Sequence, residues 1–187
     1  MDHASILSLA VEAGIDFSAR RVWIHEEINE ESIGYAMRAM MLMADHSDDP
    51  IELWVSSIGG DIDEAFGLHD MIRMLPCPVH TVAIGKICSA APLLVACGHK
   101  GQRWGTPSTV WMLHNVTGGI VEATAADMKG MTDIMQMTVR RYTELLTKYS
   151  NKSARFWANK LRAPSDQYFT SDEALEWGLI DQISVAD

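Results

Sequence analysis

Apolar and polar positions along this chain predict strands and helices in turn. Short apolar runs between turn residues indicate strands, and apolar positions three and four residues apart indicate helices. The expected strands are 21–25, 51–56, 79–84, a short one near Arg103, 110–113, an extended stretch at 166–169, and 179–183. The expected helices are about 4–13, 31–44, 61–74, 89–98, 122–149 and 154–161, with a short one from Thr170-Ser171 to Gly178.

Strands that alternate with helices predict an α/β fold, with parallel strands joined by right-handed crossovers. The length of 187 residues is that of one domain. Sites in such sheets form at the carboxyl ends of the strands. Gly59-Gly60, Ser89 and His114 each follow the end of an expected strand. This edge of the sheet is therefore the first place to look for chemistry.

The stretch from Gly85 to Gly98 contains the strongest single candidate. An apolar strand runs into Gly85, and a short turn brings Ser89 to the start of an apolar helix. Backbone N–H groups at a helix start have no partner within the helix and favour a negative oxygen. Serine is also a preferred N-cap, and Pro92 suits a first turn. Taken alone, this stretch favours a helix cap over a nucleophile.

Composition narrows the class of protein. There are 15 Lys and Arg against 25 Asp and Glu, and the formal net charge of −10 argues against nucleic acid or an anionic membrane as the main partner. The sequence has no metal-ligand spacing and no run long enough to span a membrane. We therefore expect no metal, no cofactor and a cytoplasmic protein. Cys77, Cys88 and Cys97 are expected to be buried free thiols.

Four motifs then occur in a fixed order. They are Ser57-Ile58-Gly59-Gly60 before a helix, the turn Gly85-Lys86-Ile87-Cys88-Ser89-Ala90-Ala91, Met112-Leu113-His114 with Gly118-Gly119 after it, and Asp166-Gln167-Tyr168-Phe169 leading to Gly178-Leu179-Ile180-Asp181. One of them would be a weak signal, but four in order are strong. In these motifs the chain, from about residue 21 to residue 183, resembles the ClpP family of serine peptidases.

The resemblance assigns roles to single residues. Ser89 matches the nucleophile, His114 the general base and Asp166 the carboxylate that orients the base. This set makes chemical sense, because a serine hydroxyl is a weak nucleophile until a base takes its proton. Alone, His114 would be read as a core histidine and Asp166 as a solvated loop carboxylate. The oxyanion donors implied are the backbone N–H groups of Gly60 and Ala90. The implied substrate-binding residues are Gly59, Asp61, Ile62, Asn115, Val116 and Gly118.

The resemblance also implies a fold and an assembly. The expected fold is a ClpP/crotonase-like spiral of βαβ units with a protruding handle, a strand and long helix at about residues 116–150. In the family, the handle packs two seven-membered rings face to face around a closed chamber. The expected protein is thus a serine endopeptidase that cuts peptides or unfolded proteins inside a homo-oligomeric tetradecamer, with a peptidase step that needs no ATP. The methionines of the long helix suit either a core or a subunit interface.

Several positions depart from the family pattern. Residues 1–20 form a divergent segment before a single domain at 21–187, and they do not resemble the family's axial loop, which contacts partner unfoldases. Docking of an AAA+ unfoldase through such a loop is therefore doubtful. Ser165 replaces an arginine thought to couple ring assembly to activity. Asp61 and Asp63 follow Gly60 where uncharged residues are usual, and they either stabilise their helix or favour basic substrates.

Other functions stay open at this point. A phage-type prohead maturation protease can share the fold. A crotonase-like acyl-CoA enzyme also shares it, but leaves Ser89, His114 and Asp166 jointly unexplained. A catalytically silent ring subunit that supports an active paralogue is the alternative without enzyme activity, and the complete set of three residues argues against it.

Overall fold

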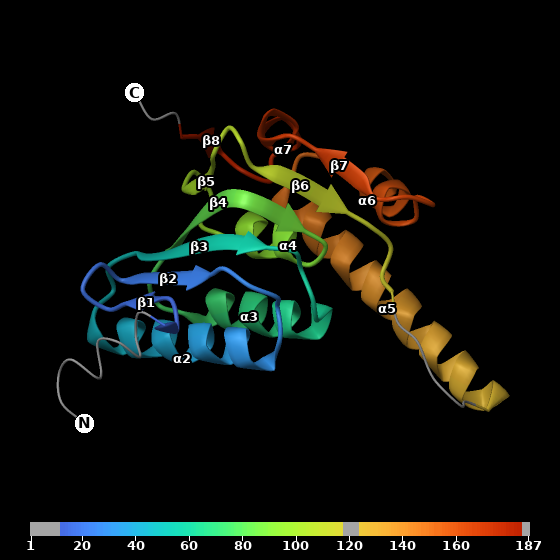
Figure 1. The fold of residues 1–187 in the computed structure, drawn as a ribbon, viewed down its shortest axis with the longest axis horizontal. Helices are drawn as coiled ribbons and strands as arrows, with labels where there is room; N and C mark the ends of the chain where they lie inside the picture. The colour runs from blue at the N-terminus through green and yellow to red at the C-terminus, as the bar shows by residue number, and fades with distance from the viewer. Residues whose placement is uncertain (1–11, 118–123, 185–187) are drawn as a thin grey trace.

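The computed structural model of this chain describes residues 12–117 and 124–184. Its elements are β1 (Ile15–Asp16), β2 (Arg21–Ile24), α2 (Glu30–His46), β3 (Ile51–Ser57), α3 (Ile62–Met74), β4 (Val79–Cys88), α4 (Ala91–Ala96), β5 (Arg103–Gly105), β6 (Val110–Leu113), α5 (Ala125–Tyr149), α6 (Ala154–Leu161), β7 (Gln167–Phe169), α7 (Ser171–Trp177) and β8 (Gln182–Ile183). They form an α/β structure, as expected (Figure 1), but its sheet also contains antiparallel pairs, which were not expected.

The strands form one mixed sheet in the order β1-β2-β3-β4-β5-β8, with β6 and β7 branching from it. The pairs β2–β3, β3–β4, β4–β5 and β5–β8 are parallel. β6 also runs parallel to β4, whereas β1–β2 and β6–β7 are antiparallel. Because β3, β4 and β6 run in one direction, their carboxyl ends meet at one edge of the sheet.

Strand β4 divides the sheet at Gly85. Its first part pairs with β5 through residues 81–83, and its last part pairs with β6 through residues 86–88. Gly85 lies between the two parts at φ 70°, a left-handed conformation that glycine adopts at little cost. The pairing with β3 also shifts register between Val55 and Ser57. The bend carries the end of β4 from one neighbouring strand to another.

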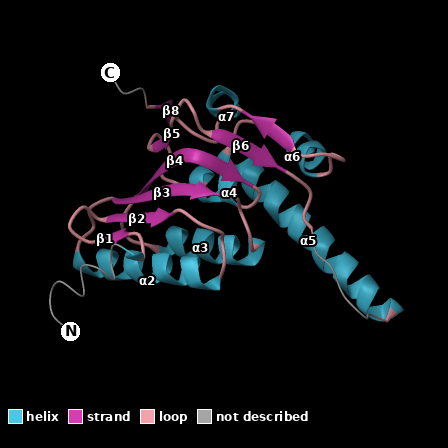
Figure 2. Cartoon of the chain, viewed as in Figure 1, coloured by secondary structure: helices cyan, strands magenta, loops and turns pink. Residues whose placement is uncertain are grey.

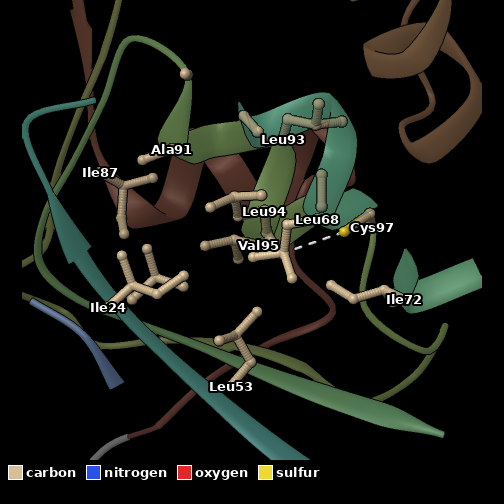
Figure 3. Close-up of a cluster of buried hydrophobic side chains, with 14 of the residues drawn as sticks. Ile24, Leu53, Leu68, Ile72, Ile87, Ala91, Leu93, Leu94, Val95 and Cys97 are labelled. Carbon is tan, nitrogen blue, oxygen red and sulfur yellow. Dashed lines mark hydrogen bonds between the residues drawn. The ribbon is translucent and has the colours of Figure 1, made fainter. Parts of the chain in front are cut away.

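The helices cover the sheet and enclose the core. Helices α2 and α3 lie side by side along the sheet, and α4 lies against β3 and β4 (Figures 1 and 2). Core side chains from strands and helices meet between these layers (Figure 3). Leu53, Leu68, Leu93 and Leu94 are fully buried there. The apolar stretch that suggested a helix in the sequence is therefore the central helix of the core.

Helix α5 is long and only partly packed on this body. Its buried residues all lie between Thr138 and Leu146. The other end runs away from the sheet (Figure 1), and Met128, Ile134 and Met137 are each more than half exposed. Part of the expected handle, Gly118 to Val121, lies outside the described residues. Helix α5, Ala125–Tyr149, confirms the long helix expected at about 122–149. The handle and the spiral arrangement stay proposals.

Several boundaries differ from those expected. β4 continues past Gly85 to Cys88, and α4 begins only at Ala91. β1 was not expected, because two residues carry no periodic signal. The helix expected at 4–13 lies almost wholly outside the described residues. Across the described ranges, none of the helices has the length and apolar character needed to cross a membrane.

Candidate active site

Ser89 lies in the turn between β4 and α4 in an unusual backbone conformation. Its φ is 60°, and Arg20 is the only other non-glycine residue of the described ranges with positive φ. Side chains rarely adopt this region, which costs on the order of 1–3 kcal/mol and persists where the surroundings enforce it. The N-cap of α4 is Ala90, and no side chain caps that helix. The helix cap that the local stretch favours when taken alone is therefore not formed, because Ala90 occupies the N-cap position.

The hydroxyl of Ser89 meets the imidazole of His114. Ser89 Oγ and His114 Nε2 are 2.8 Å apart, the distance of a good hydrogen bond. His114 follows the last residue of β6, and the backbone N–H of Ser89 donates to Met112 O of the same strand at 2.9 Å. The pairing of β4 with β6 thus brings the two side chains together. Both residues are half-buried.

Asp166 lies beside this pair but is not bonded to it. The β6–β7 ladder pairs Leu113 with Gln167, so His114 and Asp166 are opposite each other one residue further on. Asp166 is exposed, and within the described ranges it makes no hydrogen bond or ion pair. The expected orientation of His114 by Asp166 is therefore not formed in this structure, although the strand register brings the two residues next to each other.

The turn after β3 lies directly against Ser89. Gly59 has φ 93°, and a Cβ at this position would overlap the Cβ of Ser89 and the carbonyl oxygen of Cys88. Only glycine allows so close an approach. The carbonyl of Gly59 accepts from Ile28 N at 2.8 Å, and Asp61 N donates to Ile28 O at 2.8 Å. These two bonds hold the turn on both sides of Gly60.

The backbone N–H groups of Gly60 and Ala90 are the oxyanion donors expected from the sequence. Ala90 follows Ser89 directly, and Gly60 lies in the turn that packs on it. Among the turn and loop hydrogen bonds of the described chain, neither the Gly60 N–H nor the Ala90 N–H donates to a protein acceptor. Unpaired N–H groups beside a serine hydroxyl match what an oxyanion hole requires.

A pocket of about 400 Å³ opens over Ser89 and His114. It is lined by Gly60, Asp61, Ile62, Asp63, Ser89, Ala90, His114, Asn115, Val116, Thr117, Met131 and Tyr142. It thus brings together most of the residues expected from the sequence. Gly59 supports the floor behind the pocket without lining it, Asp166 lies outside the lining, and Gly118 lies outside the described residues.

Sequence reasoning missed Thr117, Met131 and Tyr142 in this pocket. Met131 and Tyr142 come from α5, which follows His114 along the chain and crosses the site. Tyr142 is buried, and its hydroxyl donates to the Ser89 carbonyl at 2.6 Å. No motif or periodicity marks a tyrosine in a long amphipathic helix as part of a site.

The acidic residues after Gly60 lie at the start of helix α3. Asp61 is the N-cap of α3, and its Oδ1 accepts from Asp63 N at 2.8 Å and from Glu64 N at 3.4 Å. This confirms that Asp61 stabilises the start of its helix. Asp61 and Asp63 also line the pocket with Ser89, so both carboxylates contribute negative charge to its mouth.

Two of the three cysteines have thiols with raised pKa values. All three are free and buried, as expected. Burial raises the pKa of the Cys88 thiol; the Lys86 ammonium lowers it in part, and the Asp166 carboxylate raises it. Burial also raises the pKa of Cys97 to about 12, so both thiols stay protonated. In the described part of the chain, no three His, Cys, Asp or Glu side chains are grouped to hold a metal ion.

Comparisons with known proteins agree on one family. The model of the family described as Clp protease matches residues 14–187. An ATP-dependent Clp protease proteolytic subunit 1 from Leifsonia xyli subsp. xyli is 29% identical over 88% of this chain and 82% of its own length. Subunits 2 of that protease from Thermobifida fusca and Mycolicibacterium paratuberculosis are 27% and 28% identical, over 88% and 89% of this chain and 80% and 82% of their own lengths. This chain, with its paired serine and histidine at the carboxyl edge of the sheet, belongs to the Clp protease family.

Proposed function

We propose that this protein is a serine endopeptidase in which Ser89 is the nucleophile and His114 the general base. The observation that carries the proposal is the 2.8 Å contact between Ser89 Oγ and His114 Nε2 at the floor of an open pocket. Membership of the Clp protease family implies a peptidase. The similar proteins are named as proteolytic subunits of such a protease.

The geometry supports a two-step hydrolysis. Ser89 Oγ attacks the carbonyl carbon of the scissile peptide bond while its proton passes to His114 Nε2. The carbonyl oxygen becomes negative and receives hydrogen bonds from the N–H groups of Gly60 and Ala90. His114 then gives its proton to the leaving amine, and the C–N bond breaks. Water attacks the acyl-enzyme with His114 as base, which releases the new carboxyl end and restores Ser89.

Asp166 is proposed as the third member of a triad. It is the residue opposite His114 in the register of β6 and β7, and we propose that its side chain turns to accept a hydrogen bond from the imidazole Nδ1. Catalytic hydrogen bonds are often loose without substrate and tighten when it binds. A carboxylate there selects the tautomer in which Nε2 accepts the serine proton.

The substrate is proposed to be an extended peptide. Asn115 and Val116 continue from β6 into an exposed segment beside the pocket, where a peptide can pair with the backbone as an added strand. Ile62 lines the same pocket, with Gly59 and Asp61 in the turn before it. Gly118 is kept in this proposal as a continuation of the segment.

The chamber and its partners are proposals of the same kind. The projecting part of α5 exposes Met128, Ile134 and Met137, and exposed apolar side chains of this kind favour a contact with another subunit. We propose stacked heptameric rings, a tetradecamer, with a peptidase step that needs no ATP. Docking of an AAA+ unfoldase through an axial loop stays doubtful, because residues 1–20 do not resemble that loop.

The direct test uses a fluorophosphonate probe, which reacts with activated serines. The probe should label the purified protein, and the same preparation should hydrolyse short unstructured peptides. Ser89→Ala should lose both activities, and His114→Ala should be about as severe. Ser108→Ala removes an exposed serine hydroxyl from the turn between β5 and β6, and it should keep both activities. Labelling that persists in Ser89→Ala would overturn the assignment.

Assays on the same purified protein distinguish the alternative functions from a serine endopeptidase. Acyl-CoA binding without peptide cleavage would favour a crotonase-like enzyme. A wild-type chain that assembles but neither reacts with the probe nor cuts peptides would be a silent ring subunit. Cleavage restricted to a single scaffolding partner would favour a prohead maturation protease.

A further inference from the structure

The strained conformation of Ser89 is held by three hydrogen bonds from different directions. Its N–H donates to Met112 O at 2.9 Å, its hydroxyl meets His114 Nε2 at 2.8 Å, and its carbonyl accepts from Tyr142 Oη at 2.6 Å. The first two partners belong to β6 and the residue that follows it. Tyr142 alone comes from α5, which is therefore an independent support for the nucleophile.

The Tyr142 hydroxyl is well suited to this contact. Its side chain is 2% exposed, so water does not compete for the Ser89 carbonyl. Burial raises the pKa of Tyr142 far above its ordinary value, and the hydroxyl therefore stays a donor at any working pH. At 2.6 Å the bond is short for a neutral hydroxyl and a carbonyl oxygen.

The peptide bond after Ser89 extends the effect of this contact. The carbonyl of Ser89 and the N–H of Ala90 belong to one planar trans peptide group, in which C=O and N–H point in opposite directions. A hydroxyl that holds the carbonyl oxygen therefore fixes where the Ala90 N–H points. A hydrogen bond to the carbonyl also polarises the group, which makes its N–H a better donor.

We propose that Tyr142 is a positioning residue: by holding the Ser89 carbonyl it keeps Ser89 Oγ directed at His114 and aims the Ala90 N–H at the developing oxyanion. The inference rests on the proposed serine peptidase function and adds a residue to it. Tyr142 lines the pocket, but its hydroxyl donates to the Ser89 carbonyl. Its loss should therefore change the rate of chemistry more than substrate binding.

The first test replaces only the hydroxyl. Tyr142→Phe should lower kcat and the fluorophosphonate reaction rate by about tenfold to a hundredfold, because a misaimed oxyanion donor loses part of its value. KM should change less than about twofold, since ground-state contacts remain. The pH midpoint of the reaction should not move, because the Tyr142 hydroxyl is bonded to the Ser89 carbonyl and His114 remains the base.

The matched control is Tyr149→Phe on the same helix. Tyr149 Oη bonds His69 Nε2 at 2.8 Å and has no contact with Ser89. This variant loses a comparable hydrogen bond and should keep kcat, while its melting temperature falls by a similar amount. If Tyr142→Phe loses no more activity than Tyr149→Phe, Tyr142 is only part of the packing and the proposal is wrong.

A second pair of variants covers the case in which Tyr142→Phe folds poorly. The side chains introduced by Tyr142→Met and Tyr142→Gln are similar in size to each other, but only glutamine can donate a hydrogen bond to the Ser89 carbonyl. If Tyr142 serves only to pack the core, the methionine variant should be the more active. If it positions Ser89, the glutamine variant should be the more active. We expect the glutamine variant to have the lower melting temperature and the higher kcat, and the reverse order of kcat would overturn the proposal.

Ser89→Ala, measured beside these variants, tests the proposed peptidase function separately from the proposed role of Tyr142. Hydrolysis that survives Ser89→Ala overturns the proposed function, and the role of Tyr142 with it. Hydrolysis that Ser89→Ala abolishes but Tyr142→Phe leaves at the wild-type rate overturns only the role of Tyr142.

Discussion

His114 and Asp166 lie opposite each other, one residue beyond the last pair of the β6–β7 ladder, without a hydrogen bond between them. Strand pairing therefore brings base and carboxylate together, while the side chain of Asp166 stays exposed. The serine–histidine contact is already formed. The Asp166–His114 contact is the one part of the proposed triad that has still to form.

Asp166→Asn tests whether the Asp166–His114 contact forms during catalysis. Triad carboxylates hold the correct imidazole tautomer, and their loss lowers kcat by up to about 10⁴-fold in triad enzymes. We expect a fall of at least a hundredfold in kcat, with little change in KM, in assays with a short peptide. Asp172→Asn, which removes another exposed carboxylate in the first turn of α7, should be silent. Equal activity of the two variants would leave Ser89 and His114 as a dyad.

The pH dependence of hydrolysis reports the base. A neutral imidazole must accept the proton of Ser89, and histidines lose their proton near pH 6.5. We expect kcat/KM to rise between about pH 6 and pH 8 and then to level off. Melting temperatures recorded over the same range show whether the fold is intact. A flat profile with an intact fold would argue against a histidine base.

The acidic mouth of the pocket predicts a substrate preference. Asp61 and Asp63 line the pocket that contains Ser89, so basic residues near the scissile bond should be favoured by charge. Asp61→Asn keeps the helix cap, because asparagine caps as well as aspartate. A peptide-library digest should show a weaker basic preference in Asp61→Asn and in Asp63→Asn.

Asp45→Asn serves as the control, because it changes the net charge equally at an exposed position near the end of α2. It should leave the cleavage pattern as in the wild type. If Asp61→Asn and Asp63→Asn also leave the pattern unchanged, Asp61 acts only as a helix cap.

The ion pair between Arg103 and Asp181 is expected to contribute strongly to the stability of the fold. The guanidinium donates from Nε to Asp181 Oδ2 at 2.8 Å and from Nη2 to Oδ1 at 2.6 Å. The side chain of Arg103 is 1% exposed and that of Asp181 is 10% exposed. Asp181→Asn leaves a buried guanidinium without its counter-charge, which costs about 3–5 kcal/mol in comparable cases. Denaturant unfolding should show a loss of this order.

The control is Glu176→Gln, which breaks the more exposed pair with Lys152. Pairs at the surface contribute about 0–1 kcal/mol, so this variant should unfold almost as the wild type does. Equal effects of Glu176→Gln and Asp181→Asn would show that the Arg103–Asp181 pair contributes no more than a surface contact.

The same pair gives stability a pH dependence. Burial alone would raise the pKa of Asp181, but hydrogen bonds from Arg103 and Lys100 outweigh it and hold the pKa well below the ordinary value. A carboxyl with a depressed pKa in the folded state stabilises the protein above its unfolded pKa of about 3.9. This contribution should be lost as the pH falls below about 4. Asp181→Asn should flatten the acid side of the stability curve, and an unchanged curve would contradict this origin.

Elements whose signals are local can be predicted from the amino-acid sequence. Strand β6 and helix α6 have the bounds expected from apolar spacing alone. The cap at Thr170 and the end of α7 at Gly178 are also as expected, because a helix end depends on residues within one turn. The order of strands and helices predicted the α/β fold, and the four motifs pointed to Ser89 and His114 before their geometry was known.

How these residues meet depends on the folded arrangement of distant elements. Ser89 looked like a helix cap because the local pattern contains no information on β6, which holds its N–H and positions His114. Tyr142 lies 53 residues from Ser89 along the chain, and nothing near it in the sequence marks the contact. The exposed state of Asp166 likewise depends on packing around two strands. Helix and strand signals reflect neighbours within a few residues, whereas an active site depends on which distant elements the folded core brings together.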